Sequence, residues 1–186
     1  CLDQEPERVF RLLSFHAGSD AAKRVHLFFD VFLPISADDR IRLCSYQIFC
    51  ERQGITVADL LNMGISPDGC TITKKGSRKH LILYNTQRDT LRQRFTVAHE
   101  LGHFVLNHVQ DSEENDAEAD CFARNLLCPA IYARAYGISP DKYGPAFHVS
   151  AAAARRAVAK YEEDLELVSP EVEKAVERLL AARTRW

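Results

Sequence analysis

The residues best suited to chemistry are His99, Glu100 and His103, which form a His-Glu-x-x-His sequence inside an apolar segment. On a helix, at about 100° per residue, the two histidines lie about 40° apart on one face, so their imidazoles can share one metal ion. Glu100 lies beside that face, where it can reach a water on the metal. Zinc makes such a water acidic enough to deprotonate near neutral pH, and a carboxylate can pass the proton to a leaving amine. The pattern therefore predicts a zinc-dependent hydrolase with Glu100 as general base.

The alternative is a core helix that carries two histidines by coincidence, but chance alone gives only roughly 0.02 matches to the motif. Apolar residues surround the motif on all sides: Phe95, Val97, Ala98, Leu101, Phe104, Val105 and Leu106. This pattern is typical of a buried helix, in which two histidines and a glutamate need partners that a metal supplies. Gly102 costs about 1 kcal/mol against Ala inside a helix, and a closely packed second helix over the site would explain it.

A catalytic zinc usually has three protein ligands, so one more is expected. The longer motif with a third histidine is absent, because Leu106 and Val109 stand at its last two positions. His108 lies about 180° from His99 around a helix, and it points away unless the helix has ended. The third ligand is therefore expected outside this segment.

The acidic run at residues 111–120 is the better source. Glu118 begins an apolar helix tied to the core, so its position is better defined than that of Glu113 or Glu114. We predict Glu118 as the third ligand, with Glu114 as the fallback. For Glu113 and Glu114 the plainer interpretation is a solvated acidic loop.

The elements expected around these residues follow an order of helices, a small antiparallel sheet, then helices, which is an α+β fold. The expected helices are 20–33, 36–54 with Ser36 as its cap, 86–107 with Thr86 as its cap, 117–127, 150–163 and 169–182. A hairpin is expected between strands 70–72 and 80–84, and a short strand is expected from Gly54. We divide the chain into an N-terminal helical extension (1–36), a metallopeptidase domain (37–165) and a C-terminal helix (166–186).

The composition is that of an ordinary soluble protein, with a formal net charge of −2 and a pI of about 6.4, which predicts no bulk attraction to nucleic acid or anionic membrane. No segment resembles a signal peptide or a membrane span. None of the six cysteines has C-x-x-C spacing, so a cysteine zinc knuckle is not expected. Reduced, buried thiols in a cytoplasmic protein are the simplest interpretation.

Two segments carry a family resemblance: RFTVAHELGH at 94–103 and DAEADCFARNLLCP at 116–129. They resemble the ImmA/IrrE metallopeptidase family, whose pattern is roughly R-F-T-x-A-H-E-x-x-H and then E-A-N/D-x-F-A-x-x-L-L-x-P. The resemblance covers about residues 37–160, including the F-x-V-S segment at 147–150. It implies a zincin-like fold and intracellular peptidases, several of which cut helix-turn-helix repressors in mobile-element or stress-response circuits.

By position, the resemblance assigns His99, His103 and Glu118 as metal ligands and Glu100 as the catalytic glutamate. Asp120 stands where the family often has Asn, and its role stays open. The metal implied is Zn²⁺, although Mn²⁺ and Fe²⁺ also suit two histidines and a carboxylate. The partner implied is a protein substrate, a helix-turn-helix repressor, without direct contact to nucleic acid or membrane.

Three further interpretations remain open at this point. Zinc peptidases commonly hold substrate against an exposed strand edge, and residues 81–84 are either such an edge or an ordinary structural strand. Residues 147–160 form either a DNA-recognition helix or, more simply, a packing helix with a solvated basic face. The chain could also be a non-cleaving, metal-binding module that sequesters a regulator, but Glu100 would have no use there.

Overall fold

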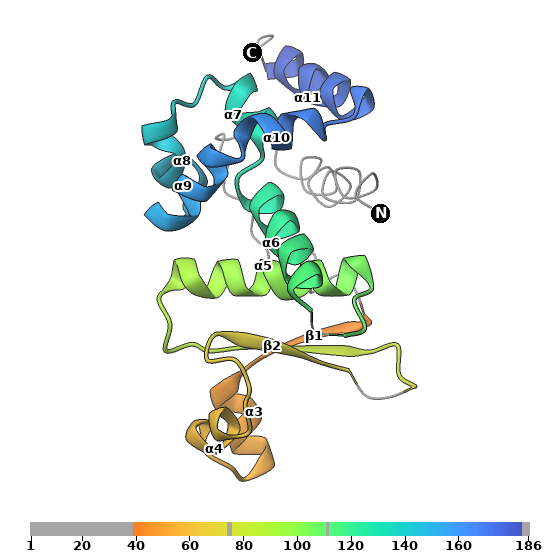
Figure 1. The fold of residues 1–186 in the computed structure, drawn as a ribbon, viewed down its shortest axis with the longest axis vertical. Helices are drawn as coiled ribbons and strands as arrows, with labels where there is room; N and C mark the ends of the chain where they lie inside the picture. The colour runs from red at the N-terminus through yellow and green to blue at the C-terminus, as the bar shows by residue number, and fades with distance from the viewer. Residues whose placement is uncertain (1–38, 74–75, 111, 184–186) are drawn as a thin grey trace. The chain divides into compact units, whose positions relative to one another are not determined.

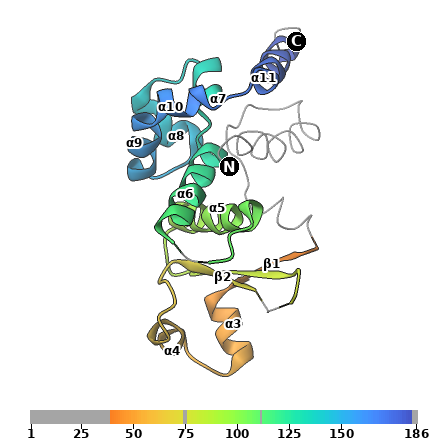
Figure 2. The ribbon, with the colours of Figure 1, turned by 45° about the vertical axis from the view of Figure 1, so that its right-hand side comes forward.

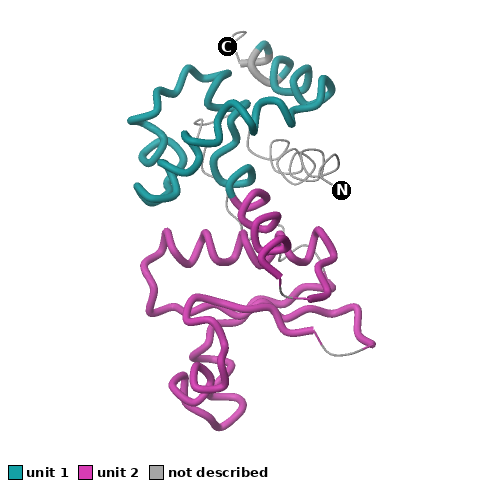
Figure 3. Tube along the Cα trace, viewed as in Figure 1, with its two compact units in different colours: residues 1–29, 124–186 teal, residues 30–123 magenta. Residues whose placement is uncertain are grey.

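The computed structural model describes residues 39–73, 76–110 and 112–183. The helix predicted at 20–33 and the cap predicted at Ser36 lie outside these residues. The described residues form two compact units, 39–123 and 124–183, and α6 runs from the first into the second (Figure 3). Each unit is described by itself.

The first unit is built on a three-stranded sheet in the order β1-β3-β2. β2 (Gly69–Thr73) and β3 (His80–Tyr84) pair antiparallel, as the predicted hairpin requires. β1 (Ile41–Ser45) pairs parallel with β3, so the small sheet is mixed, within an α+β fold as predicted. β3 is therefore the central strand, so residues 81–84 form an ordinary structural strand and not the exposed edge that was the other open interpretation.

Helices cover both faces of this sheet. Figures 1 and 2 show α5 (Thr90–Leu106) along one face and α3 (Tyr46–Gln53) and α4 (Val57–Asn62) beyond the other. Adjacent residues of the central strand, Ile82 and Leu83, are both fully buried because both faces are covered. The sheet and α5 together make the platform of the site.

Two predictions near the first strand are wrong. The helix expected over 36–54 begins only at Tyr46, because residues 41–45 pair with β3, and Ser45 caps the helix by accepting from the Ile48 N–H. No strand begins at Gly54. Thr56 and Asp59 form a capping box that starts α4 instead. In both places a long-range pairing or a local cap decided the conformation, not the apolar spacing.

The second unit is entirely helical in the described residues. It holds the end of α6 (Glu113–Leu127), α7 (Ala130–Ala135), the 3₁₀ turn η2 (Pro140–Lys142), α8 (Tyr143–Phe147), α9 (Ala151–Ala159), α10 (Tyr161–Glu166) and α11 (Pro170–Arg183). A bidentate ion pair joins Arg124 to Asp164 within this unit, and both N–H···O distances are 2.7 Å. Asp164 is only 2% exposed. Arg155 and Arg156 lie exposed on α9, which both interpretations of that helix allow.

None of the helices in the part of the chain that the structure describes is long and apolar enough to cross a membrane. The five cysteines within the same residues form no disulfide, and Cys50 and Cys128 are buried. This agrees with the interpretation of the thiols as small reduced hydrophobes.

Candidate metal centre

The helix α5 carries the His-Glu-x-x-His motif, and a polar network fixes where this helix begins. Its cap is Asp89, which accepts from the Arg92 N–H, so the predicted cap at Thr86 is wrong. Thr86 instead donates to the Gln47 side chain at 2.6 Å, in the turn before the helix. The predicted C-terminal end near Asn107 is confirmed, since the helix ends at Leu106 with Asn107 as its left-handed cap.

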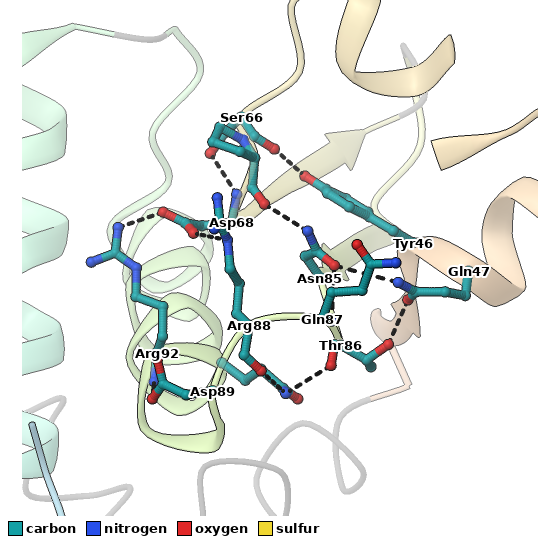
Figure 4. Close-up of polar contacts among 12 residues, drawn as sticks. Tyr46, Gln47, Ser66, Asp68, Asn85, Thr86, Gln87, Arg88, Asp89 and Arg92 are labelled. Atoms are coloured by element: carbon teal, nitrogen blue, oxygen red, sulfur yellow. Dashed lines mark hydrogen bonds and ion pairs between the residues drawn. The ribbon is translucent and has the colours of Figure 1, made fainter. Parts of the chain in front are cut away.

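Asp68, just before β2, binds the first turn of α5 and the segment that precedes this helix (Figure 4). Its carboxylate pairs with Arg88 at 2.8 Å and accepts from the Arg92 guanidinium. The hydrogen bond from Arg92 holds the pKa of Asp68 below its usual value. Asn85 donates to the Pro67 carbonyl at 2.9 Å in the same network. These contacts fix the start of β2 against the start of α5, and so set the strand beside the motif.

Gly102 is the point where the second helix crosses α5. A Cβ added there would lie 3.1 Å from the Ala119 Cα, 3.1 Å from the Phe122 ring and 3.2 Å from the Ala119 carbonyl oxygen. Ala119 is fully buried. The close-packed second helix predicted from Gly102 is therefore present, and it is α6. Asp116 and Asp120, three residues before and one after Ala119, lie on the same face of α6 and reach the two histidines.

His99 is oriented by Asp120, whose role the sequence left open. His99 Nδ1 lies 2.8 Å from Asp120 Oδ1, so the ring donates from Nδ1 and keeps the Nε2 lone pair for another partner. Burial lowers the pKa of His99, but the hydrogen bond to Asp120 and the charge of Glu100 outweigh it, and the pKa is raised.

His103 is contacted by His108, which was expected to point away from the site unless the helix had ended. Because α5 ends at Leu106, His108 folds back, and its Nδ1 lies 2.9 Å from His103 Nδ1. The other ring nitrogen of His108 lies 2.9 Å from Glu118 Oε2. The side chain of His108 is only 7% exposed. The condition attached to His108, that the helix has ended, is met.

The Nε2 atoms of His99 and His103 lie 3.0 Å apart, and a carboxylate oxygen of Asp116 lies within 4.0 Å of both. Its Oδ1 lies 3.4 Å from His103 Nε2 and 4.0 Å from His99 Nε2. These three side chains form a group whose ligand atoms all lie within 4.8 Å of one another. Glu118 contacts His108 instead, so its assignment as third ligand stays a prediction.

The residues present fit a tetrahedral zinc. Ligand atoms at ~2.0–2.2 Å from a tetrahedral ion lie about 3.3–3.6 Å from one another, close to the separations found here. When the two Nδ1 atoms donate to Asp120 and His108, both Nε2 atoms carry lone pairs, and these atoms lie 3.0 Å apart and 4.0 and 3.4 Å from Asp116 Oδ1. Converging lone pairs repel unless a proton or a cation lies between them, and two imidazoles with a carboxylate form a common zinc donor set.

Glu100 lies beside the histidines but does not join their group. It is 9% exposed, and its Oε2 accepts from the Thr71 hydroxyl at 2.8 Å. Thr71 lies on β2, whose only strand partner in the described residues is β3. The arrangement therefore places a carboxylate next to the histidine pair and against a strand that has one side without a strand partner in the described residues.

Sequence reasoning did not single out Asp116, Thr71 or the contact of His108 with His103. Two signals could have found part of this. Asp116 and Asp120 are four residues apart, so a helix that begins early enough places both on one face. Asn107 tolerates the left-handed conformation that ends helices, which turns His108 back toward the motif.

Comparison with known sequences identifies a protein family. A sequence model of a peptidase family, described as the IrrE N-terminal-like domain, matches residues 50–168, which is more than half of the chain. No curated protein matches the sequence. The matched segment contains β2, α5 and the part of α6 that carries the three acidic residues of the site.

Proposed function

Since the chain belongs to the IrrE N-terminal-like peptidase family, we propose that it is a zinc-dependent endopeptidase that cuts another protein. The observation that carries the proposal is the convergence of His99 Nε2 and His103 Nε2, 3.0 Å apart, beside a buried glutamate. A purely structural pair of histidines would not need both Nδ1 atoms held by hydrogen-bond partners. Zinc is favoured by the donor set, while manganese and iron are chemically compatible with it.

We propose His99 and His103 as two metal ligands and a carboxylate of α6 as the third. The position of Asp116, 3.4 Å from His103 Nε2, supports Asp116 in this role. Glu118 is the alternative that the family pattern favours. Removal of the true ligand should lower zinc affinity by far more than removal of the other residue.

Bound zinc would supply a Lewis acid that polarises the scissile carbonyl and lowers the pKa of water. The catalytic work of the chain is then done by Glu100. Its carboxylate takes a proton from the attacking water and returns it to the nitrogen of the departing amine. Thr71 donates to one oxygen of Glu100, which helps to fix the position of this carboxylate. Burial of Glu100 limits exchange of that proton with bulk solvent.

The substrate strand is proposed to lie along β2. The central strand β3 is paired on both sides, whereas β2 has one side without a strand partner in the described residues. A peptide added there would use main-chain hydrogen bonds and tolerate varied side chains. Its backbone would pass next to Thr71, and thus next to Glu100.

The substrate class that we propose is a helix-turn-helix transcriptional repressor. The support is the resemblance of the two motif segments to a family in which several members cut such repressors. The test is co-expression with candidate regulators, followed by mass spectrometry of the fragments, with and without a zinc chelator. A fragment that forms only with metal present supports the proposal.

The second candidate function is a metal-binding module that binds a regulator without cutting it. Binding of an intact regulator by the zinc-loaded protein, with no fragment at any time, would favour this alternative. If no regulator is bound or cut, the proposed substrate class is wrong.

A further inference from the structure

We propose that β2 binds an extended peptide segment through the main chain of Thr71 and Thr73, and that Arg78 and Lys79 select a segment flanked by acidic residues. The inference rests on the proposed function, because it gives a register and a charge preference to the substrate strand proposed along β2. It names the chemical class of that segment: a strand-forming stretch with Asp or Glu beside it.

The pairing of β2 with β3 determines which main-chain groups of β2 point outward. Asn85 donates its N–H to the Asp68 carbonyl at 2.9 Å, so these two opposed residues form a hydrogen-bonded pair that continues the register of the two strands. In an antiparallel ladder every second residue bonds to the neighbouring strand. The N–H and C=O groups of Thr71 and Thr73 therefore point away from β3.

A second hydrogen bond supports this register. The His80 N–H donates to the Arg40 carbonyl at 2.7 Å, on the β1 side of β3. It points away from β2, as expected if Thr73, the residue opposite His80, belongs to a non-hydrogen-bonded pair. Among the described residues, no strand pairs with the outer side of β2. Two outward positions, each with one donor and one acceptor, can therefore pair with a peptide.

These outward positions lie beside the candidate metal centre. The Thr71 hydroxyl donates to Glu100 at 2.8 Å, so a peptide residue opposite Thr71 lies next to that carboxylate. Two residues further along β2, the Thr73 hydroxyl lies 2.8 Å from His80 Nδ1. The His80 ring contacts the Phe104 ring, with centroids 4.8 Å apart. The hairpin end of the sheet therefore lies at the C-terminal end of α5.

The connection from β2 to β3 is strongly basic. Four of its six residues, 74–79, are Lys or Arg, and no acidic residue occurs between Asp68 and Asp89. Arg78 and Lys79, here called the hairpin cations, are both exposed. Neither forms an ion pair with another residue in the described ranges. Their charges are therefore not neutralised within the part of the chain that the structure describes.

The other end of β2 differs, because its basic neighbours are neutralised. Arg88 and Arg92 both bind the carboxylate of Asp68. A segment bound along β2 thus meets uncompensated positive charge only toward the hairpin, where carboxylates are attracted. A strand rises about 3.3 Å per residue, so acidic residues about two to four positions from the one opposite Thr71 reach the hairpin cations.

Basic residues beside an open strand have another known effect, which is to keep two copies of a protein from pairing edge to edge. Repulsion of a second copy predicts no binding of a separate peptide. Selection of a substrate segment predicts that acidic peptides bind more tightly than neutral ones, in a register that uses Thr71 and Thr73. The two explanations are therefore separable by experiment.

The experiment measures binding of labelled peptides to the full metal-free chain by fluorescence anisotropy, so that no peptide is cut and no zinc is needed. The peptides share a centre of alternating Val and Thr and differ only in flanks of Glu, Gln or Lys. Two exposed charge pairs, at about 1.4- to 5-fold each, should make the Glu peptide bind about 2- to 30-fold more tightly than the Gln peptide. Added salt should reduce the difference.

Charge reversal tests the hairpin cations. Arg78→Glu combined with Lys79→Glu should invert the preference, so that the Lys peptide binds more tightly than the Glu peptide. The matched control reverses Arg155 and Arg156, two adjacent exposed cations on α9, and should leave the preference unchanged. Equal binding of the three peptides, or a Glu preference that survives reversal of the hairpin cations, overturns the proposal. Displacement of the Glu peptide by a single-stranded oligonucleotide as effectively as by unlabelled peptide also overturns it.

Thr73→Pro tests the main-chain contact. Proline removes the outward N–H of residue 73 without removing a bond to β3, and edge strands tolerate it. Binding of the Glu peptide should weaken by about 2- to 12-fold. The control Thr73→Val loses the same hydroxyl but keeps the N–H, and it should bind normally. N-methylation of single peptide residues repeats the test on the native chain: binding should weaken at alternate positions only, and equal effects at all positions would overturn the register.

Failure of this inference can be told apart from failure of the proposed function. If the peptides behave as expected but the zinc-loaded chain cuts neither them nor any regulator, the proposed hydrolysis fails and the binding surface stands. If a regulator is cut while the charge of the peptides has no effect on binding, only the binding surface is overturned.

Discussion

Gly102→Ala should loosen the metal centre without touching any of its polar residues. The added Cβ would meet the Ala119 Cα at 3.1 Å and the Ala119 carbonyl oxygen at 3.2 Å. These are backbone atoms of α6 and cannot rotate away. The helix must therefore shift by about 0.3–0.5 Å to restore ordinary contact distances. Asp116 and Asp120 move with it, because both belong to α6.

Two opposing effects set the size of the change. Ala in place of Gly favours a helix by about 1 kcal/mol, whereas overpacking a close contact costs about 1–3 kcal/mol. The free energy of unfolding of the metal-free protein should therefore fall by about 1 kcal/mol. A metal site works only when its ligands stay within about 0.5 Å of the productive geometry. A shift of α6 by this amount should therefore lower zinc affinity by about tenfold.

Urea unfolding of the metal-free protein and chelator competition for zinc measure the two effects separately. The expected pattern is a lower midpoint with an unchanged slope, together with weaker zinc binding. A Gly102→Ala protein that gains about 1 kcal/mol and binds zinc normally would mean that α6 does not lie against Gly102.

Two other changes test the surroundings of the site. Thr71→Val removes the hydroxyl that donates to Glu100, so kcat should fall by about tenfold at unchanged zinc content. The control Thr71→Ser keeps the hydroxyl and should keep the rate. Equal kcat values for the native chain and Thr71→Val would contradict the role of this contact. Asp68→Asn removes a carboxylate whose pKa is lowered mainly by the hydrogen bond from Arg92. A carboxyl group whose pKa is lowered by folding stabilises the fold at pH values above its pKa in the unfolded chain, about 3.9. This stabilisation is lost as the pH falls through the lower pKa of the folded state. Urea titrations should therefore find the native chain about 1 kcal/mol more stable than Asp68→Asn at pH 6, with the gap closing toward pH 2, and a gap that does not change with pH would refute the assignment.

Local patterns predicted the parts of the fold that local forces decide. The helix that carries the candidate site was placed from its apolar residues, and its predicted end near Asn107 was correct. The hairpin followed from two β-prone runs around a basic turn. β1 was missed because residues 41, 44 and 48 also have helical spacing, and only the parallel pairing with β3 makes 41–45 a strand.

The part of the candidate site that lies on a single helix, α5, was predictable from the sequence. His99, Glu100 and His103 are fixed by spacing on α5, and Gly102 indicated the second helix that is found there. Which carboxylate of that second helix faces the histidines was not predictable, because it depends on where α6 begins. The helix starts at Glu113, four residues before the predicted start, which brings Asp116 into its first turn and onto the histidine side.

The most direct test of the central claim compares Glu100→Gln with His99→Ala. If Glu100 is the general base and not a ligand, Glu100→Gln should retain nearly full zinc while cleavage slows by roughly 10²–10⁴-fold. His99→Ala should lose both zinc and cleavage. Metal content and cleavage rate of a protein substrate, measured on the same preparations, separate the two effects. Cleavage at the native rate by Glu100→Gln would contradict the hydrolytic mechanism and favour a module that binds its partner without cutting it.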